Sequence, residues 1–244
     1  MDKSEAYQLL TNYTKRLKLN LHDLTDKKVF IFAPHPDDET LGCGGMILKL
    51  KRAGADVRLV LCTNGKNEDE YRYVATRMKE FSMAVKSLDL HTKDIQYLRA
   101  AEGHMRSAKT RLGQQISKLI EEYRPNWIFV PYLLDINNDH LTTNYILADC
   151  LEENEEMTIA MYEVWTPILY PNFYLNITDV FSQKCAAIQC YDTQEQQYAI
   201  LDRCRALCKL RASLLGKRQY QYVEAFKYFS APEYKRITNA LIKP

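Results

Sequence analysis

Residues 29–45 read VFIFAPHPDDETLGCGG, and this stretch decides the predicted fold. The β-branched and aromatic run Val29–Phe32 is typical of a buried strand, whereas the glycine-rich apolar segment after the acids is typical of a helix. Between them stand one histidine, His35, and three adjacent acidic residues. Neighbouring carboxylates repel one another unless a cation lies among them. The stretch therefore predicts a strand, a polar turn suited to a metal, and a helix.

The rest of the chain alternates strands with helices. We expect strands over residues 28–33, 56–62, 95–98, 126–130 and 158–164, and helices over residues 4–18, 41–53, 70–88, 107–123 and 140–151. This alternation predicts an α/β fold with a Rossmann-like, mostly parallel sheet and helices on both faces. Beyond residue 165, a short strand at 173–177 and helices over 179–190 and 194–214 predict a C-terminal helical cap. We expect residues 1–244 to form a single domain, because no linker or repeat interrupts them.

The composition is that of an ordinary globular protein. Apolar residues make up 46% of the 244 residues, and 33 basic residues nearly balance 31 acidic ones, for a formal net charge of +2. So small a charge produces no field that would attract nucleic acid or an anionic membrane. We therefore expect a small-molecule partner and no nucleic acid. The late helices could cap the sheet or form a homo-oligomer interface, and their pattern leaves both open.

A run of basic residues in the last third of the chain is the one local exception. Because leucines interleave with it, we expect a solvated face of an amphipathic helix rather than a patch for a polyanion. The run consists of Arg203, Arg205, Lys209, Arg211, Lys217 and Arg218.

The seven cysteines include no Cys-x-x-Cys pair. Their odd number argues against a disulfide framework, and their spacing argues against a thiolate zinc site, so a reducing, cytoplasmic location is expected. The first 20 residues are charged throughout and lack the apolar segment of a signal peptide. We also expect no membrane span, because no window approaches roughly 18 uninterrupted apolar residues.

Two polar clusters follow predicted strands. One is residues 35–39, after the first strand, and the other is residues 135–140, after the strand at 126–130. The carboxyl ends of strands in an open parallel sheet converge on a crevice that holds the functional residues. We therefore expect the two clusters to meet at one edge of the sheet.

The clusters contain a candidate set of metal ligands. Pro36 favours an extended His35 that projects into the crevice, and Asp38 can turn back towards the same point. Catalytic zinc commonly has three protein ligands and an open position for water, and His140 is the best candidate for the third ligand. Each residue also has a plain structural explanation, since Asp38 could be an N-cap and His140 could simply open its helix. Taken together, with Asp37 and an aspartate at 139 beside them, they favour a metal site.

The glycines at 42, 44 and 45 allow a rival interpretation, a dinucleotide-binding turn. That fingerprint requires a glycine three residues after Gly44, where Ile47 stands, and a phosphate would face the three acids of residues 37–39. We prefer the interpretation that these glycines let the helix pack close to the sheet. Glu39 is expected to favour the helix N-terminus.

The residues 33–39, APHPDDE, closely resemble the His-Pro-Asp-Asp-Glu signature of the PIG-L/LmbE-like family of zinc-dependent de-N-acetylases. The resemblance extends from Val29 to Phe229, and the first motif is its most specific part. Other landmarks are Arg77-x-x-Glu80 with Ala84, Asn137-Asn138-Asp139-His140, Tyr162-Glu163-x-Trp165, Ile177–Lys184, Tyr191-x-x-Gln194 and Glu224-Ala225-Phe226.

The resemblance implies roles for individual residues. His35, Asp38 and His140 would bind zinc or another divalent metal, and Asp37 would be the general base. Asn137 stands where the family usually has a histidine that polarises the substrate carbonyl. An asparagine amide can still donate a hydrogen bond to an oxyanion but carries no positive charge. Asp139 would orient a neighbouring ligand or donor.

The implied reaction is metal-assisted hydrolysis of the acetamide of an N-acetylglucosamine-type unit in a small conjugate, which releases acetate and a free amine. Arg77 could hold an anionic or hydroxyl-rich part of the substrate, and Glu163 with Trp165 could line the sugar site. The plain alternatives are an Arg77–Glu80 helical pair and ordinary packing. A different class of function, a non-catalytic sugar- or nucleotide-binding regulator, remains the alternative.

Overall fold

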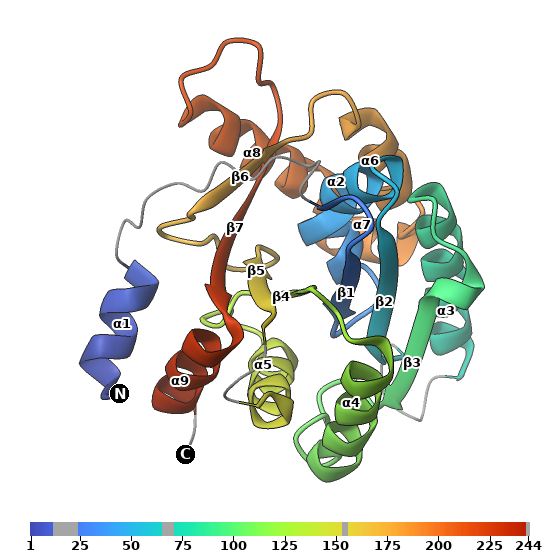
Figure 1. The fold of residues 1–244 in the computed structure, drawn as a ribbon. Coiled ribbons are helices and arrows are strands. Elements are labelled where there is room, and N and C mark those ends of the chain that lie inside the picture. The colour runs from blue at the N-terminus through green and yellow to red at the C-terminus, as the bar shows by residue number, and fades with distance from the viewer. Residues whose placement is uncertain (12–23, 65–70, 153–155, 243–244) are drawn as a thin grey trace.

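The computed structural model describes residues 1–11, 24–64, 71–152 and 156–242 (Figure 1). Its strands are β1 (Lys28–Ala33), β2 (Asp56–Thr63), β3 (Ile95–Ala100), β4 (Trp127–Pro131), β5 (Thr158–Tyr162), β6 (Phe173–Asn176) and β7 (Val223–Ser230). Its helices are α1 (Lys3–Thr11), α2 (Asp38–Arg52), α3 (Tyr71–Ser87), the short 3-10 helix η2 (Thr92–Asp94), α4 (Lys109–Tyr123), α5 (Asn138–Cys150), α6 (Phe181–Ile188), α7 (Asp192–Tyr198), α8 (Ile200–Ser213) and α9 (Ala231–Ile242).

The strands form one sheet in the order β3-β2-β1-β4-β5-β7-β6. The first five strands in this order are parallel, whereas β7 is antiparallel to both β5 and β6. The predicted α/β fold with a mostly parallel sheet is therefore confirmed. None of the described helices has the length and apolarity that crossing a membrane requires.

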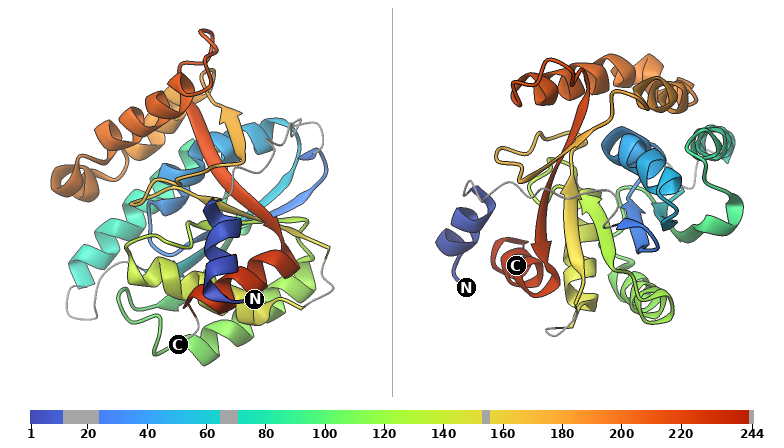
Figure 2. Two further views of the ribbon diagram at one scale, coloured as in Figure 1. Left: turned by 90° about the vertical axis from the view of Figure 1, so that its left-hand side faces the viewer. Right: turned by 45° about the horizontal axis from the view of Figure 1, so that its top comes forward.

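Helices cover both faces of the sheet, as Figure 2 shows. The strand β1 supplies both cores, because successive side chains of a strand point to opposite faces. Val29 and Ile31 join the core under α2 and α3, whereas Phe30 and Phe32 join the core under α4, α5 and α9. Nearly every residue of β1 is buried, which explains its continuous apolar run.

The late part of the chain departs from the prediction in three ways. The single helix expected over 194–214 is two helices, α7 and α8, divided at Ala199, whose φ is +48°. The strand β7 and the helix α9 were not predicted from the sequence. The cap itself is confirmed, since α6 packs against α2 and α8 packs against β7. Of the leading helix expected over 4–18, α1 is the described part, and residues 12–18 lie outside the described ranges.

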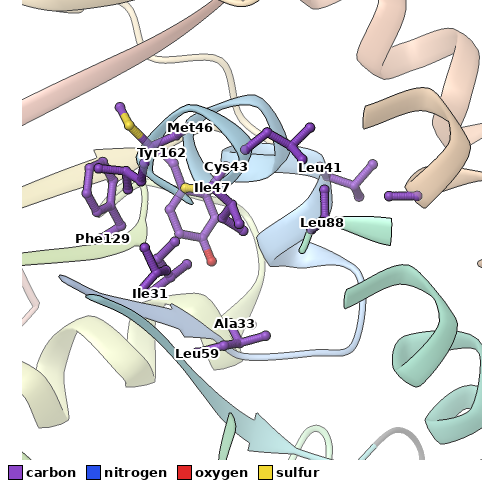
Figure 3. Close-up of a cluster of buried hydrophobic side chains, with 14 of the residues drawn as sticks. Ile31, Ala33, Leu41, Cys43, Met46, Ile47, Leu59, Leu88, Phe129 and Tyr162 are labelled. Atoms are coloured by element: carbon purple, nitrogen blue, oxygen red, sulfur yellow. The ribbon is translucent and has the colours of Figure 1, made fainter. Parts of the chain in front are cut away.

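The helix α2 packs very closely on the sheet. It begins at Asp38, three residues earlier than expected. Figure 3 shows the Tyr162 side chain against α2, near Cys43 and Ile47. A Cβ atom at Gly42 would lie 2.1 Å from the ring atom Cδ2 of Tyr162. The predicted reason for the glycines, close packing of the helix, is therefore confirmed at Gly42.

Candidate metal and active site

The strand order changes direction between β1 and β4. The chain runs from β1 to β2 and β3 on one side, and then crosses to β4 and β5 on the other. Because β1 and β4 are parallel neighbours, their carboxyl ends open on the same crevice. Residues 35–39 follow β1 and residues 135–140 follow β4, so the two polar clusters meet there as the sequence predicts.

Three buried side chains converge in this crevice. Nδ1 of His35 and Nε2 of His140 each lie 3.2 Å from Oδ2 of Asp38. One candidate ligand atom from each of the three residues lies within 4.8 Å of the others. Neither ring nitrogen of His140 makes a regular hydrogen bond within the described part of the chain, although both are buried. Two imidazoles and a carboxylate around one point are a donor set that suits zinc.

Each histidine also meets a carboxylate on the other side of its ring. Nε2 of His35 lies 3.1 Å from Oδ2 of Asp139, and Nδ1 of His140 lies 3.4 Å from Oδ1 of Asp135. Such carboxylates orient a metal-binding imidazole and make it a better ligand. Asp139 lies where the sequence predicts an orienting carboxylate. The part played by Asp135 was missed, although the residue lies inside the predicted polar cluster.

The charges of the cluster depend on one another. Burial alone would raise the pKa of Asp38, but the imidazoles of His140 and His35 hold it below its usual range. Burial alone would lower the pKa of His140, yet the carboxylates of Asp38 and Asp135 raise it to about 9. Without a metal, protons on the imidazoles balance the negative charge of the Asp38 carboxylate. A bound cation would balance that charge instead, and the imidazoles would then be neutral.

Asp37 lies beside the candidate ligands in an unusual backbone conformation. Its φ is +131°, a region that costs free energy for any residue except glycine. Nη2 of Arg77 donates to the Pro36 carbonyl at 2.5 Å and lies 3.5 Å from Oδ2 of Asp37. Burial and the neighbouring Asp38 carboxylate raise the pKa of Asp37, against the attraction of Arg77. A buried carboxyl with a raised pKa next to a candidate metal site has the properties of a general base.

Glu39 does more than favour the N-terminus of α2, which is what the sequence predicted for it. Its side chain is fully buried, and its Oε1 accepts hydrogen bonds from the Tyr191 hydroxyl at 2.5 Å and from the Thr40 hydroxyl. Its Oε2 also accepts from the backbone N–H of Asp37 at 3.3 Å, at the start of α2. Glu39 therefore ties the motif to the segment that precedes α7.

Asn137 caps the helix that carries His140. Its Oδ1 accepts a hydrogen bond from the backbone N–H of Asp139 at 2.8 Å, and its own N–H donates to Oδ1 of Asp135 at 3.0 Å. Asn137 is half-buried. The cap leaves the amide Nδ2 of Asn137 as the part of the side chain that can donate to a ligand.

The three residues predicted on the substrate side lie close to the crevice, but each is engaged within the protein. Arg77 contacts Pro36 and Asp37, as described above. The Glu80 carboxylate instead accepts hydrogen bonds from the backbone N–H and the hydroxyl of Thr193, at 2.9 Å and 2.7 Å. The alternative of an Arg77–Glu80 helical pair is therefore wrong. The buried Glu163 pairs with Arg211 and accepts from the Ile168 N–H at 2.7 Å.

Trp165 is covered on one side by another residue of the basic run. The guanidinium carbon of Arg203 lies 3.8 Å from the Trp165 ring centroid, and the Tyr198 ring meets the indole edge-on at 5.3 Å. The backbone N–H of Trp165 donates to Oδ2 of Asp135 at 3.0 Å, which joins this segment to the metal site. The expectation of a solvated basic face is therefore wrong for two residues, since Arg203 packs on Trp165 and Arg211 is buried.

Comparison with known proteins agrees with this geometry. The family model described as PIG-L, GlcNAc-PI de-N-acetylase, matches residues 30–151, which is half of the chain. A curated relative from Mycobacterium sp. (strain KMS), named 1D-myo-inositol 2-acetamido-2-deoxy-alpha-D-glucopyranoside deacetylase, is 27% identical over 179 residues. That alignment covers 60% of this chain and 56% of the relative, so the match spans little more than half of the relative's length.

Solved structures share the fold across most of the chain. An N,N'-diacetylchitobiose deacetylase from Pyrococcus horikoshii superposes with a TM-score of 0.71 at 22% identity, covering 95% of this chain and 94% of that chain. The 4-carboxy-2-hydroxymuconate hydratase GalB from Pseudomonas putida KT2440 superposes with a TM-score of 0.69 at 19% identity, covering 83% and 95%.

The two solved structures carry names of different reactions, so the shared fold does not by itself specify the chemistry. The match to the family model does not depend on the fold alone, because it includes both polar clusters of the crevice. The candidate ligands and Asp37 all lie within the matched residues. This chain therefore belongs to the PIG-L family.

Proposed function

We propose that the protein is a metal-dependent hydrolase that removes the acetyl group from an N-acetylglucosamine-type unit of a small glycoconjugate. The observation that carries this proposal is the convergence of His35, Asp38 and His140 on one buried point, with Asp37 beside them. Membership of the PIG-L family and the deacetylase names of relatives support it. The products are acetate and a free amine.

The residues divide the reaction among them. A divalent cation held by His35, Asp38 and His140 would acidify a water molecule and polarise the acetyl carbonyl. Asp37 would accept a proton from the attacking water and would return it to the departing amine. The Asn137 amide donates a hydrogen bond to the oxygen that becomes negative when the carbonyl is attacked.

We assign zinc as the metal from the donor set. Two imidazole nitrogens and one carboxylate oxygen leave an open position for water, as catalytic zinc sites do. Asp139 and Asp135 hold the two imidazoles from behind, so the rings are oriented before a cation binds.

We still place three residues on the substrate side of the site: Arg77, Glu163 and Trp165. Their contacts within the protein indicate that they position other groups or shape the site. Arg77 positions Asp37 through its bond to Pro36. Glu163 and Trp165 shape the wall of the site, because the charge of Glu163 is already balanced by Arg211 and one side of Trp165 is covered by Arg203.

A screen for acetate release tests the proposal. The purified protein is incubated with N-acetylglucosamine conjugates, with and without a chelator, and both acetate and free amine are measured. We expect release of equal amounts of both products, loss of release with the chelator and its return with zinc. Binding of a sugar conjugate without release of acetate by the zinc-loaded protein would instead favour the non-catalytic regulator.

A further inference from the structure

The peptide group that joins Pro36 to Asp37 is held at both of its polar atoms. Nη2 of Arg77 donates to the Pro36 carbonyl oxygen at 2.5 Å, and Oε2 of Glu39 accepts the Asp37 N–H at 3.3 Å. The φ of Asp37 is +131°, a conformation that a non-glycine residue keeps only where surrounding contacts impose it. Because φ is the rotation about the N–Cα bond that follows this peptide group, Arg77 and Glu39 together set the direction of the Asp37 side chain.

Glu39 is itself held by a tyrosine from a distant part of the chain. Its buried Oε1 accepts hydrogen bonds from the hydroxyls of Tyr191 and of the adjacent Thr40, each at 2.5 Å. Thr40 lies on the same helix as Glu39, so of the two hydroxyls only that of Tyr191 comes from another element. The Tyr191 side chain is fully buried, so its hydroxyl depends on a protein acceptor.

The start of α7 also holds Arg77, indirectly. The Glu80 carboxylate, one turn after Arg77 on α3, accepts the Thr193 N–H at 2.9 Å and the Thr193 hydroxyl at 2.7 Å. The Gln194 amide donates to the Tyr73 hydroxyl, also on α3, at 3.0 Å. The start of α7 therefore fixes the helix from which Arg77 reaches the peptide group.

We propose that Tyr191 and Thr193 are positioning residues that fix the Asp37 carboxyl beside the candidate metal site. Tyr191 acts through Glu39, and Thr193 acts through α3 and Arg77. This inference rests on the proposed function, in which Asp37 is the general base. A displacement of about 1 Å can lower a catalytic rate by about 10²-fold, so removal of either hydroxyl should lower kcat.

Removal of single hydroxyl groups tests the inference in the zinc-loaded protein. Tyr191→Phe keeps the buried ring, and Thr193→Val keeps the shape of the side chain and the backbone bond to Glu80. With the best substrate of the acetate-release screen, we expect kcat to fall by about 10-fold in Tyr191→Phe and by about 3-fold in Thr193→Val, with KM and zinc content nearly unchanged. Thr193→Ser, which restores a hydroxyl, should recover the wild-type kcat.

Tyr123→Phe is the matched control. Tyr123 is also buried, and its hydroxyl donates to the Asp56 carbonyl at 2.6 Å, at the start of β2 and therefore at the opposite end of the sheet from the crevice. Both phenylalanine variants lose one hydrogen bond, so both should have a lower Tm than wild type. Only Tyr191→Phe should have a lower kcat when assayed below its unfolding temperature. A purely structural role of Tyr191 predicts the same kcat in the two variants.

Hydrogen exchange gives a readout that does not depend on turnover. We expect the peptide that covers residues 35–41 to exchange faster in Tyr191→Phe than in Tyr123→Phe or wild type. Wild-type kcat in both Tyr191→Phe and Thr193→Val, a fall in kcat explained by lost zinc, or unchanged exchange of residues 35–41 would overturn the inference.

The outcomes separate the inference from the proposed function. If wild type releases no acetate, the proposed function fails, and the exchange rates alone decide whether Tyr191 and Thr193 hold Asp37 in place. If Tyr191→Phe does not fold, Thr193→Val and Thr193→Ser provide both readouts.

Discussion

Nε2 of His35 lies 3.1 Å from Oδ2 of Asp139, on the opposite side of the imidazole from Asp38. The same carboxylate oxygen accepts the backbone N–H of Gly103 at 2.6 Å, so the position of Asp139 is itself held. Burial alone would raise the pKa of Asp139, but the hydrogen bonds with His35 and Gly103 lower it below its usual value. An ionised Asp139 therefore turns the other ring nitrogen of His35 towards the proposed cation.

Asp139→Asn tests this arrangement. We expect the substitution to weaken zinc affinity by about 10- to 100-fold, because an amide orients the imidazole less strongly than a carboxylate does. Competition with a chromogenic chelator measures the affinity. Asp149→Asn on the same helix is the control, since Asp149 forms a half-exposed ion pair with Lys109. Equal affinities of the two variants would show that Asp139 does not support the ligand.

The pH dependence of the metal-free protein follows from His140. Its pKa in the folded protein is about 9, above its ordinary value of about 6.5. The resulting stabilisation is complete below about pH 6.5 and is lost as the pH rises through about 9. After chelation, the difference in Tm between wild type and His140→Gln should therefore shrink across this range. A difference that grows with pH would show that His140 enters the fold as the neutral form.

Zinc affinity should change in the opposite sense over the same range. The cation binds the neutral imidazole, so the proton on His140 must leave when the metal binds. We expect the apparent affinity to rise from pH 6.5 to 9 in wild type, and equally in His104→Gln, since His104 is exposed on the surface. A flat profile would contradict this competition between proton and metal.

Asn137 is expected to act in turnover as well as in capping. Asn137→Ala removes both functions, whereas Asn137→Asp keeps an acceptor for the Asp139 N–H and loses the amide donor. The alanine should lower stability by about 1 kcal/mol, and both variants should lower kcat with nearly unchanged zinc content. Steady-state kinetics and Tm separate the two effects. Full turnover by Asn137→Asp would mean that other groups hold the oxyanion.

Gly42→Ala should destabilise the protein through a steric clash. The new Cβ would lie 2.1 Å from the Tyr162 ring, and the ring cannot move freely because its hydroxyl donates to the Phe32 carbonyl at 2.6 Å. We expect a loss of about 1–3 kcal/mol or more in urea unfolding. Gly113→Ala, inside α4 with no atom closer than 3.9 Å, should instead stabilise by about 0.5–1 kcal/mol. Similar effects of both would contradict the close packing of α2.

The part of the fold that the sequence predicted well is the part with simple patterns. The strands of the parallel region are buried on both faces, so their continuous apolar runs were visible. The site was predicted for a related reason: strand ends place residues 35–39 and 135–140 at one edge, whatever the details of the loops.

The strand β7 was missed because polar residues interrupt its apolar pattern. Glu224 is buried, and it pairs with Lys184 at 2.6 Å and accepts the Gly45 and Met46 N–H groups of α2. Partners so distant along the chain leave no local signal. The inward orientation of Arg203 and Arg211 was missed likewise, because α8 alternates charge with leucine in the same way as a solvated helix.

In the proposed reaction, Asp37 acts on water beside a metal that is held by other residues. The most direct test measures zinc content and acetate release of Asp37→Asn on the same preparation. We predict about one zinc ion per chain in both proteins and a loss of kcat of at least about 10²-fold in the variant, because a general base is removed and the ligands remain. Wild-type turnover by a zinc-loaded Asp37→Asn protein would show that Asp37 is not the general base.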